Sequence, residues 1–484
     1  MSDGDSEDPV VRRERFSGGP ARGFLSSLAA DERIFAADLA VDTAHVVMLE
    51  EQGIIETDVT AEILEALSAV ESAGFDSLPE GEDVHEAIET AVIDAVGPDG
   101  GTMHTARSRN DEVATCIRYR LREDLLSAAE ATIAFREALT DVATSHTETV
   151  MPGYTHLQPA QPTTVGHFLA SYEQAVSRDT GRLFYAVDRT NRSPLGAAAF
   201  AGTPFDIDRE RTASLLGFDG VLENSMDAVS TRDFLLESVG ALANLAVTLS
   251  GLAEDLVVFA NRGFVELDDA YSSTSSIMPQ KKNPDTLELI RGTAGDAAAS
   301  FNGLFATLKG LPRAYNRDLQ RATPHVWEAV DDLVDATDVA AGAVETATWN
   351  DDALSAAADE GFSTATGVAD ALAMAGLPFR SAHEIVATAA EQGGDLEAIR
   401  DATESVTGRE LDSFLDPSAV EDQLDPATSV AERDSSGGPS PGTLERSLSE
   451  SKTDIAADSD AVADRRESIA EAQSRLESVV ATYV

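Results

Sequence analysis

The stretch 233–261, "DFLLESVGALANLAVTLSGLAEDLVVFAN", decides the fold. Drawn as a helix, it is apolar over most of its circumference, and a helix of this kind must be buried on every side. The acidic residues at 237, 254 and 255 argue against a membrane span. The stretch therefore predicts the central helix of a bundle of long helices shared between subunits, and hence a homo-oligomer.

Helical spacing of apolar residues also dominates the rest of the chain, and runs typical of strands are nearly absent. The expected helices are modest at first and then very long, over about 31–53, 58–73, 83–96, 109–148, 162–191, 230–261, 283–310 and 317–348. From about residue 362 they shorten again, before a last helix near 442–482.

This pattern predicts an all-α protein built around a central bundle of long helices, residues 109–361. Smaller helical domains are expected on either side of it, over 1–108 at the N-terminus and 362–484 at the C-terminus.

The chain is strongly acidic, with 86 Asp and Glu against 35 Lys and Arg and a formal net charge of −51 over 484 residues. Such a chain repels phosphate, so we expect no nucleic acid and no anionic membrane among its partners. Because the acids are spread along the sequence, we interpret them as a solvated surface adapted to a salt-rich cytoplasm, where ions screen their repulsion.

The single cysteine, Cys116, rules out a disulfide within the chain and fits a reducing compartment. We expect it to be a buried structural thiol rather than a nucleophile. The N-terminus "MSDGDSEDPVVRRERF" lacks the apolar core of a signal peptide, which predicts a cytoplasmic protein.

Three polar loops lie at the ends of the long helices. In "DGGTMHTARSRND" (99–111), Asn110 or Asp111 is either a helix cap or a ligand, and the helix start would favour a bound carboxylate. In "GYTHLQPAQP" (153–162), Thr155 and His156 lie in a loop stiffened by prolines, where a histidine suits proton delivery or has a structural role. The third loop, "NSMDAVSTRDF" (224–234), reads mostly as capping.

A fourth loop, "SSTSSIMPQKKNPD" (272–285), holds two of the four lysines of the chain. Its end, Asn283-Pro284 followed by acids, is typical of a helix start. A mobile linker would explain serine and lysine but not their concentration here. A cationic, serine-bearing loop beside a helix N-terminus suits a dicarboxylate, and it can stabilise negative charge that develops during a reaction.

The fourth loop resembles the signature of the fumarase/aspartase superfamily, whose members eliminate fumarate from C–N or C–O substrates. Together with it, other motifs are similar to the argininosuccinate lyase family, in the same order and from about residue 16 to the C-terminus: "SRND", "GYTHLQPAQP", "NSMDAVS", "AYNRDLQ" and "FSTATGVADALAMAGLPFRSAH". The resemblance implies a central five-helix bundle and a homotetramer whose active sites are each built from three subunits. It also implies cleavage of argininosuccinate into arginine and fumarate without a metal or an organic cofactor.

The resemblance assigns the catalytic roles by motif. Ser275 would be the base that removes a proton next to a carboxylate, with Lys281 and backbone N–H groups stabilising its alkoxide. His156 would be the proton donor or its relay. Glu288 would be the acidic partner that orients the active-site histidine, although it would also complement a helix dipole.

The substrate contacts follow in the same way. The carboxylates of the substrate would be held by Lys281 and Asn283. The resemblance also implies that the substrate is bound by Ser27, Asn110 and Thr155. Its arginine portion would be held by Tyr315 and Gln320. The segment "GEDVHEAIE" with Asp83 and His85 matches a family segment near the active site, where His85 is as readily structural.

Several positions depart from the family pattern. Thr274 stands where a glycine is usual, and Thr323 replaces a lysine that helps bind substrate, with Arg317 and Arg321 as candidates to supply its charge. Thr231 stands where Asp is common, and "RFSGGPARGF" replaces the familiar "WGGRF". No role follows for Lys282.

Two alternative functions stay open. The first is another fumarate-releasing lyase, such as adenylosuccinate lyase or aspartase, which "SRND" and "PQKKNPD" disfavour. The second is a non-catalytic structural protein on the same scaffold, like some lens crystallins, and the retention of His156 and Ser275 counts against it.

Overall fold

The computed structural model describes residues 21–484. The first twenty residues of the predicted 1–108 domain, including the start of "RFSGGPARGF", lie outside the described part. The described chain is almost entirely helical, so the all-α prediction is confirmed.

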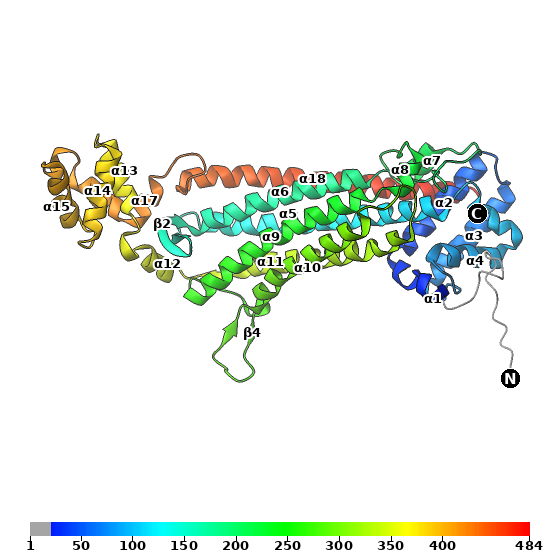
Figure 1. Ribbon diagram of the computed structural model, residues 1–484, viewed down its shortest axis with the longest axis horizontal. Coiled ribbons are helices and arrows are strands. Elements are labelled where there is room, and N and C mark those ends of the chain that lie inside the picture. Colours follow the sequence, from blue (N-terminus) through cyan, green and yellow to red (C-terminus); the bar gives the residue numbers. More distant parts are fainter. Residues whose placement is uncertain (1–20) are drawn as a thin grey trace.

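Five long helices lie side by side and form an elongated bundle (Figure 1). They are α5 (Arg109–Ser145), α6 (Val165–Thr190), α9 (Asp233–Arg262), α10 (Asp285–Leu308) and α11 (Thr323–Thr346). Within residues 21–484, α9 is the one helix long and apolar enough to cross a membrane. It packs instead on α6, α10 and α11, so it is a core helix of the bundle.

The prediction that α9 is buried on every side is not met within one chain. Only 44% of its most apolar window is buried, and Val247 in the middle of the helix is 69% exposed. A broad face is therefore covered by the neighbouring helices, while the remaining apolar surface faces outward.

The N-terminal domain packs against one end of the bundle and has its own apolar core (Figure 1). Its elements are α1 (Ala21–Leu25), η2 (Leu28–Ile34), α2 (Phe35–Glu51), α3 (Thr57–Ala73), η3 (Phe75–Ser77), α4 (Val84–Val96) and η4 (Pro98–His104). Two short helices, α7 (Arg209–Leu215) and α8 (Ser225–Ser230), lie at the same end.

A second small domain with a separate core lies at the opposite end of the bundle (Figure 1). It is built from η7 (Glu360–Phe362), α13 (Ala365–Met374), α14 (Phe379–Ala390), α15 (Leu396–Thr407), η8 (Leu411–Ser413), α16 (Pro417–Leu424) and α17 (Pro426–Ala431). Helix α12 (Asp351–Ala358) precedes this domain and contributes Leu354 to the core of the bundle.

The last helix, α18 (Pro441–Val480), does not belong to that domain, in contrast to the predicted 362–484 unit. It runs back along α5 and α6 and reaches α2 and α7 at the N-terminal end. The physical reason is a heptad stripe of buried apolar residues that needs a long helical surface to pack on: Leu448, Ile455, Val462, Ile469 and Leu476.

Short antiparallel strand pairs interrupt the helices, although runs typical of strands are nearly absent from the sequence. They are β1 (Val150–Thr155) with β2 (Gln158–Thr164), β3 (Val265–Glu266) with β6 (Thr348–Trp349), and β4 (Ser273–Thr274) with β5 (Lys282–Asn283). Two 3-10 turns, η5 (Asp269–Tyr271) and η6 (Arg317–Arg321), complete the elements. The β4–β5 hairpin projects from the side of the bundle (Figure 1).

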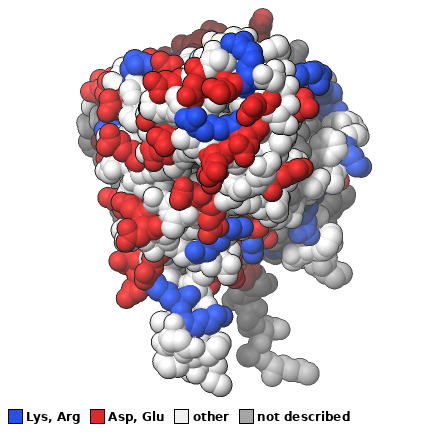
Figure 2. Space-filling model, turned by 90° about the vertical axis from the view of Figure 1, so that its left-hand side faces the viewer, with Lys and Arg blue, Asp and Glu red and all other residues white. Residues whose placement is uncertain are grey.

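Acidic side chains cover the face of the molecule that Figure 2 shows, with few basic ones among them. The projecting β4–β5 hairpin at the lower edge of that view is white and blue. The segment 270–284 contains no acid and two lysines. The chain therefore presents one cationic projection on a strongly acidic surface.

Candidate active site

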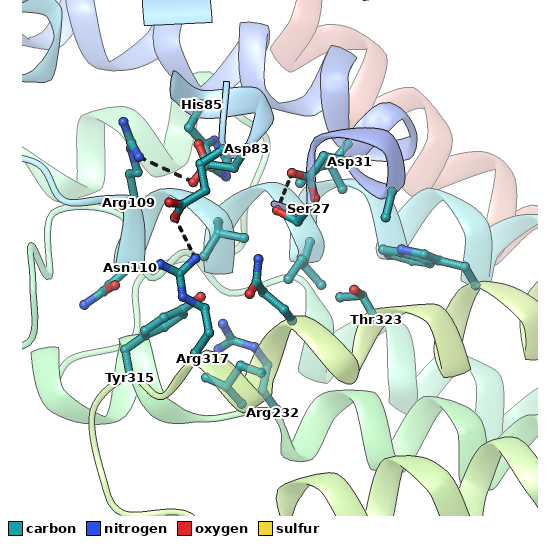
Figure 3. Close-up of a pocket in the computed structure, with 18 residues that line it drawn as sticks. Ser27, Asp31, Asp83, His85, Arg109, Asn110, Arg232, Tyr315, Arg317 and Thr323 are labelled. Carbon is teal, nitrogen blue, oxygen red and sulfur yellow. Dashed lines mark hydrogen bonds and ion pairs between the residues drawn. The ribbon is translucent and has the colours of Figure 1, made fainter. Parts of the chain in front are cut away.

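A polar cavity of about 210 Å³ lies where the N-terminal domain meets the bundle (Figure 3). Its walls come from η2, the start of α4, the start of α5, and the segment 315–327. Four of the predicted substrate-binding residues line it together: Ser27, Asn110, Tyr315 and Gln320. Arg232, just before α9, lines it as well, so segments from five separate parts of the sequence meet in one cavity.

One wall of the cavity is acidic and includes Asp31 and Asp83 (Figure 3). Ser27 Oγ donates a hydrogen bond to Asp31 Oδ2 at 2.8 Å, and Val84 N lies 3.3 Å from the same oxygen. Burial raises the pKa of Asp31 to about 6. Asp31 is not conspicuous in the sequence, because an acid in "LAADER" resembles any acid on the surface of a helix.

The opposite wall carries Arg232, which is 4% exposed. Its Nη1 donates to the carbonyls of Val229 (3.3 Å) and Thr231 (2.8 Å), while its Nε has no partner among the described residues. Burial lowers the pKa of Arg232 to about 10. A buried guanidinium that lines a cavity and has no carboxylate partner in this part of the chain can pair with an anion that enters the cavity. From the sequence, the segment 224–234 was expected mainly to cap a helix, so Arg232 was not predicted as a site residue.

Arg317 lies on the same side as Arg232, and its Nη1 pairs with Glu82 Oε1 at 2.7 Å. Thr323 also lines the cavity, whereas Arg321 does not. Of the two arginines considered as substitutes for the missing lysine, Arg317 is therefore the one at the cavity.

The amide side chains at the cavity are held by backbone carbonyls. Asn110 Nδ2 donates to Ala199 O at 3.0 Å, and Gln320 Nε2 donates to Leu25 O at 3.2 Å. Asn110 is not the cap of α5, because Ser108 and Asp111 form a capping box there. Asp111 also accepts from Gly196 N and Ala198 N, which fixes the neighbouring loop.

Thr155 and His156 lie elsewhere, in the β1–β2 hairpin at the other end of the bundle (Figure 1). His156 and Leu157 form its tip with positive φ angles of 57° and 58°. The side chain of His156 is exposed. Within one chain, the predicted proton donor is thus separated from the cavity by the length of the bundle.

Ser275 and Lys281 lie on the projecting β4–β5 hairpin, again away from the cavity. Ser275 Oγ accepts hydrogen bonds from Met278 N at 3.1 Å and from Ile277 N at 3.3 Å. Two backbone donors aimed at one hydroxyl oxygen stabilise negative charge on that oxygen. The hairpin tip itself is open, since Ile277 is 83% exposed.

Asn283 and Glu288 lie at the base of this hairpin and in the first turn of α10. Asn283 pairs with Ser273 in the strand register, and Glu288 is exposed. Glu288 lies at the start of α10 and His156 in the β1–β2 hairpin, so the two residues belong to different elements of the chain.

Lys282, for which the sequence suggested no role, pairs with two acids of the segment that leads from α9 to the hairpin. Its Nζ lies 2.8 Å from Asp269 Oδ1 and 3.1 Å from Glu266 Oε1. The two adjacent lysines therefore have different surroundings, because Lys282 is engaged at the base while Lys281 is exposed on the loop.

The fold and the matches to known families show that the protein is a lyase. Residues 26–298 match the family model described as "Lyase", and residues 362–431 match the one described as "Argininosuccinate lyase C-terminal". A solved structure of EDDS lyase in complex with formate superposes with a TM-score of 0.84 at 32% identity, covering 96% of each chain. The chain is a helical-bundle lyase.

Sequence relatives narrow the class. The chain is 68% identical to the argininosuccinate lyase of Natronomonas pharaonis over 99% of its length and 98% of that protein. It is 62% identical to the argininosuccinate lyase of Haloarcula marismortui, over 99% of this chain and 97% of the relative. The chain belongs to the argininosuccinate lyase family.

Proposed function

We propose that this protein cleaves argininosuccinate into arginine and fumarate by β-elimination, the last step of arginine biosynthesis, in the cytoplasm. The observation that carries the proposal is the polarity of the cavity, in which the acids Asp31 and Asp83 face the unpaired guanidinium of Arg232. Argininosuccinate carries a guanidinium between a succinyl dicarboxylate and an α-amino-acid end. Its cationic groups can therefore pair with the acidic wall, and one of its carboxylates can pair with Arg232.

The proposed reaction begins when Ser275 removes the proton from the carbon next to a substrate carboxylate. The donors Ile277 N and Met278 N favour the alkoxide that this step requires. The resulting aci-carboxylate carries two negative charges, and Lys281 and Asn283 would hold them.

His156 would then protonate the leaving guanidinium nitrogen, with Glu288 orienting it from another subunit. Every proton transfer in this route is assigned to a side chain, so the route requires no metal and no organic cofactor. Thr155 would contact the substrate beside His156, and Tyr315 and Gln320 would hold its arginine portion.

We further propose a homotetramer in which three subunits contribute to each active site. The cavity, the His156 hairpin and the Ser275 hairpin lie apart within one chain, so chemistry that uses all three needs more than one copy. Large apolar side chains exposed on the outer faces of α6, α9 and α10 support such packing: Tyr185, Val247, Leu289 and Phe305.

The function is tested by following the ultraviolet absorbance of fumarate after argininosuccinate is added to the protein in molar salt. We expect salt to be needed, because the strongly acidic surface suits a salt-rich cytoplasm and the relatives above come from halophilic archaea. We expect fumarate release from argininosuccinate but not from adenylosuccinate. Folded protein that releases none would reject the enzyme and favour the structural-protein alternative.

Replacing Arg232 with methionine should raise KM for argininosuccinate by about 100-fold, because a desolvated carboxylate contact at the cavity is lost. Steady-state kinetics measure the change. Arg118→Met is the matched control, because Arg118 is equally buried and also donates to backbone carbonyls but does not line the cavity. Equal KM values for the two variants would show that Arg232 does not bind substrate.

A further inference from the structure

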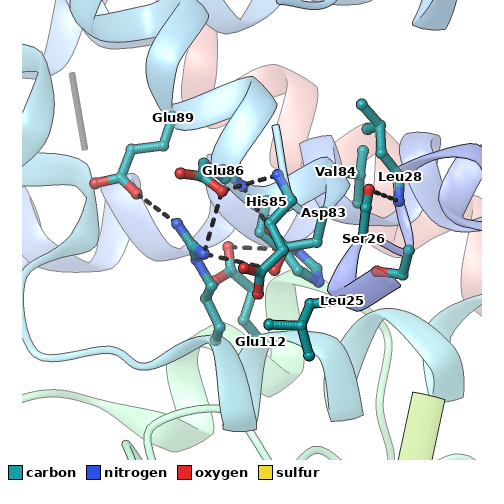
Figure 4. Close-up of polar contacts among 12 residues, drawn as sticks. Leu25, Ser26, Leu28, Asp83, Val84, His85, Glu86, Glu89 and Glu112 are labelled. Carbon is teal, nitrogen blue, oxygen red and sulfur yellow. Dashed lines mark hydrogen bonds and ion pairs between the residues drawn. The ribbon is translucent and has the colours of Figure 1, made fainter. Parts of the chain in front are cut away.

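A buried polar cluster surrounds His85, which Figure 4 shows near Glu112 and next to Asp83 of the acidic wall. The side chain of Asp38, on α2, is at its centre and is fully buried. Asp38 Oδ2 lies 2.7 Å from His85 Nδ1, and Asp38 Oδ1 accepts a hydrogen bond from Cys116 Sγ at 3.3 Å. Each carboxylate oxygen therefore has its own partner, and the buried Cys116 predicted from the sequence helps to fix Asp38.

His85 connects this cluster to the cavity. It is 5% exposed, lines the cavity, and its Nε2 has no hydrogen-bond partner among the described residues. Its Nδ1 also lies 3.7 Å from Glu112 Oε1. The imidazole is thus held from the protein side at Nδ1, and no group in this part of the chain engages its other nitrogen.

The charged groups around His85 come from every element that packs on it. Asp38 and Asp42 lie on α2, Glu112 on α5, Asp83 at the start of α4 and Asp31 on η2, with Arg107 and His104 as the basic neighbours. Burial alone would lower the pKa of His85, but Asp38, Glu112 and Asp83 outweigh it and raise that pKa well above its ordinary value.

Arg107 already supplies the cation between the other two acids of the cluster. Its Nη1 lies 2.5 Å from Asp42 Oδ1, and its Nη2 lies 3.0 Å from Glu112 Oε1. Arg107 is thus shared by Asp42 and Glu112, whereas His85 is the basic group in direct contact with Asp38, at 2.7 Å.

The charge of His85 acts on Asp31. Burial raises the pKa of Asp31, and the largest opposing influence is the positive charge of His85. If His85 became neutral, the pKa of Asp31 would rise further, and a larger fraction of Asp31 would be protonated near neutral pH. A protonated Asp31 cannot form an ion pair with a cationic group in the cavity.

We infer that Asp38 is a positioning residue for substrate binding, because it holds a charged His85 against the cavity wall and so keeps Asp31 an anion for a cationic group of the substrate. The inference rests on the proposed function. It assigns a role to Asp38 and Cys116, neither of which touches the cavity.

The test is the pH dependence of kcat/KM in the Asp38→Asn variant, measured by fumarate release. Activity should fall on the acidic side as Asp31 is protonated, and this acidic limb should move to higher pH by about one unit in the variant. The change should be in KM, while kcat at saturating substrate stays near the wild-type value. His85→Gln should produce a similar shift, and the double variant should shift no further, since Asp38 acts through His85.

Glu173→Gln is the matched control. Glu173 is a buried carboxylate on α6 that pairs with Arg136 Nε at 3.0 Å and accepts from Ser451, far from the cavity. Its loss should leave the acidic limb unchanged. An unmoved limb in Asp38→Asn, or a shift that persists when His85 is already replaced, would overturn the inference.

Two further outcomes are decisive. If Asp38→Asn does not fold in molar salt by circular dichroism, His85→Gln decides alone, and an unshifted limb there rejects the inference. If wild-type protein releases no fumarate, the proposed function fails and the inference fails with it, whereas an active wild-type enzyme with an unmoved limb rejects the inference only.

Discussion

Replacing Ser275 with alanine should lower the turnover of argininosuccinate by at least about 100-fold. The physical reason is the geometry of the hairpin, where two backbone N–H groups converge on Ser275 Oγ. Alanine leaves these donors in place but removes the oxygen that would take the proton. KM should change little, because the binding groups of the cavity are untouched. The measurement is fumarate release under saturating substrate in molar salt.

Ser276→Ala controls for the loss of a hydroxyl on the same loop. Ser276 is the next residue, and no hydrogen bond from its hydroxyl is found within residues 21–484. We expect this variant to stay within about tenfold of the wild-type turnover. If Ser275→Ala is nearly as active as wild type, or if Ser276→Ala is equally impaired, the base is not Ser275.

The bundle was predictable because its helices carry a strong local signal. The apolar stretch that forms α9 requires a buried site, and its neighbours have the periodicity that supplies one. The outward-facing Val247 also fits the predicted sharing of this helix between subunits, which one chain cannot test. The helical periodicity of apolar residues was therefore enough to predict an all-α fold.

The course of α18 was the main feature of the fold that was missed. Its mean composition resembles a surface helix, and its position after a glycine- and serine-rich loop suggested a domain end. The sequence does indicate this course, because apolar residues recur every seven positions from Leu448 to Leu476. This spacing forms a narrow apolar stripe that packs along other long helices. For α18, the seven-residue spacing of apolar residues therefore indicates its packing better than its average composition does.

The site was predictable in its chemistry but not in its assembly. The loops around His156 and Ser275 stood out because stiff or cationic polar loops are unusual, but no local pattern says how far apart two loops lie. Arg232 and Asp31 are not recognisable in the sequence as site residues. Arg232 stands out because it is buried without a carboxylate partner, and Asp31 because it is buried near His85. Those properties arise only when distant segments meet.

Mixing two inactive variants should restore activity, and this is the result that separates a shared active site from one built within a single chain. His156→Asn and Ser275→Ala are each expected to lose at least about 100-fold in turnover. In tetramers reassembled from equal amounts of both, each site takes its His156 hairpin and its Ser275 hairpin from different subunits. About a quarter of the sites should then combine two intact hairpins, so the mixture should recover about a quarter of wild-type activity.

The recovery is tested by dissociating the two variants together, restoring molar salt, and measuring fumarate release against each variant treated alone. A second mixture, of Ser275→Ala with the double variant His156→Asn/Ser275→Ala, should recover nothing, because no subunit in it carries an intact Ser275. The arrangement of the chain leads to this expectation, since the β1–β2 hairpin and the cavity lie at opposite ends of the bundle and the β4–β5 hairpin projects from its side. A first mixture as inactive as the second would mean that each chain closes its own site, and the proposed sharing would be wrong.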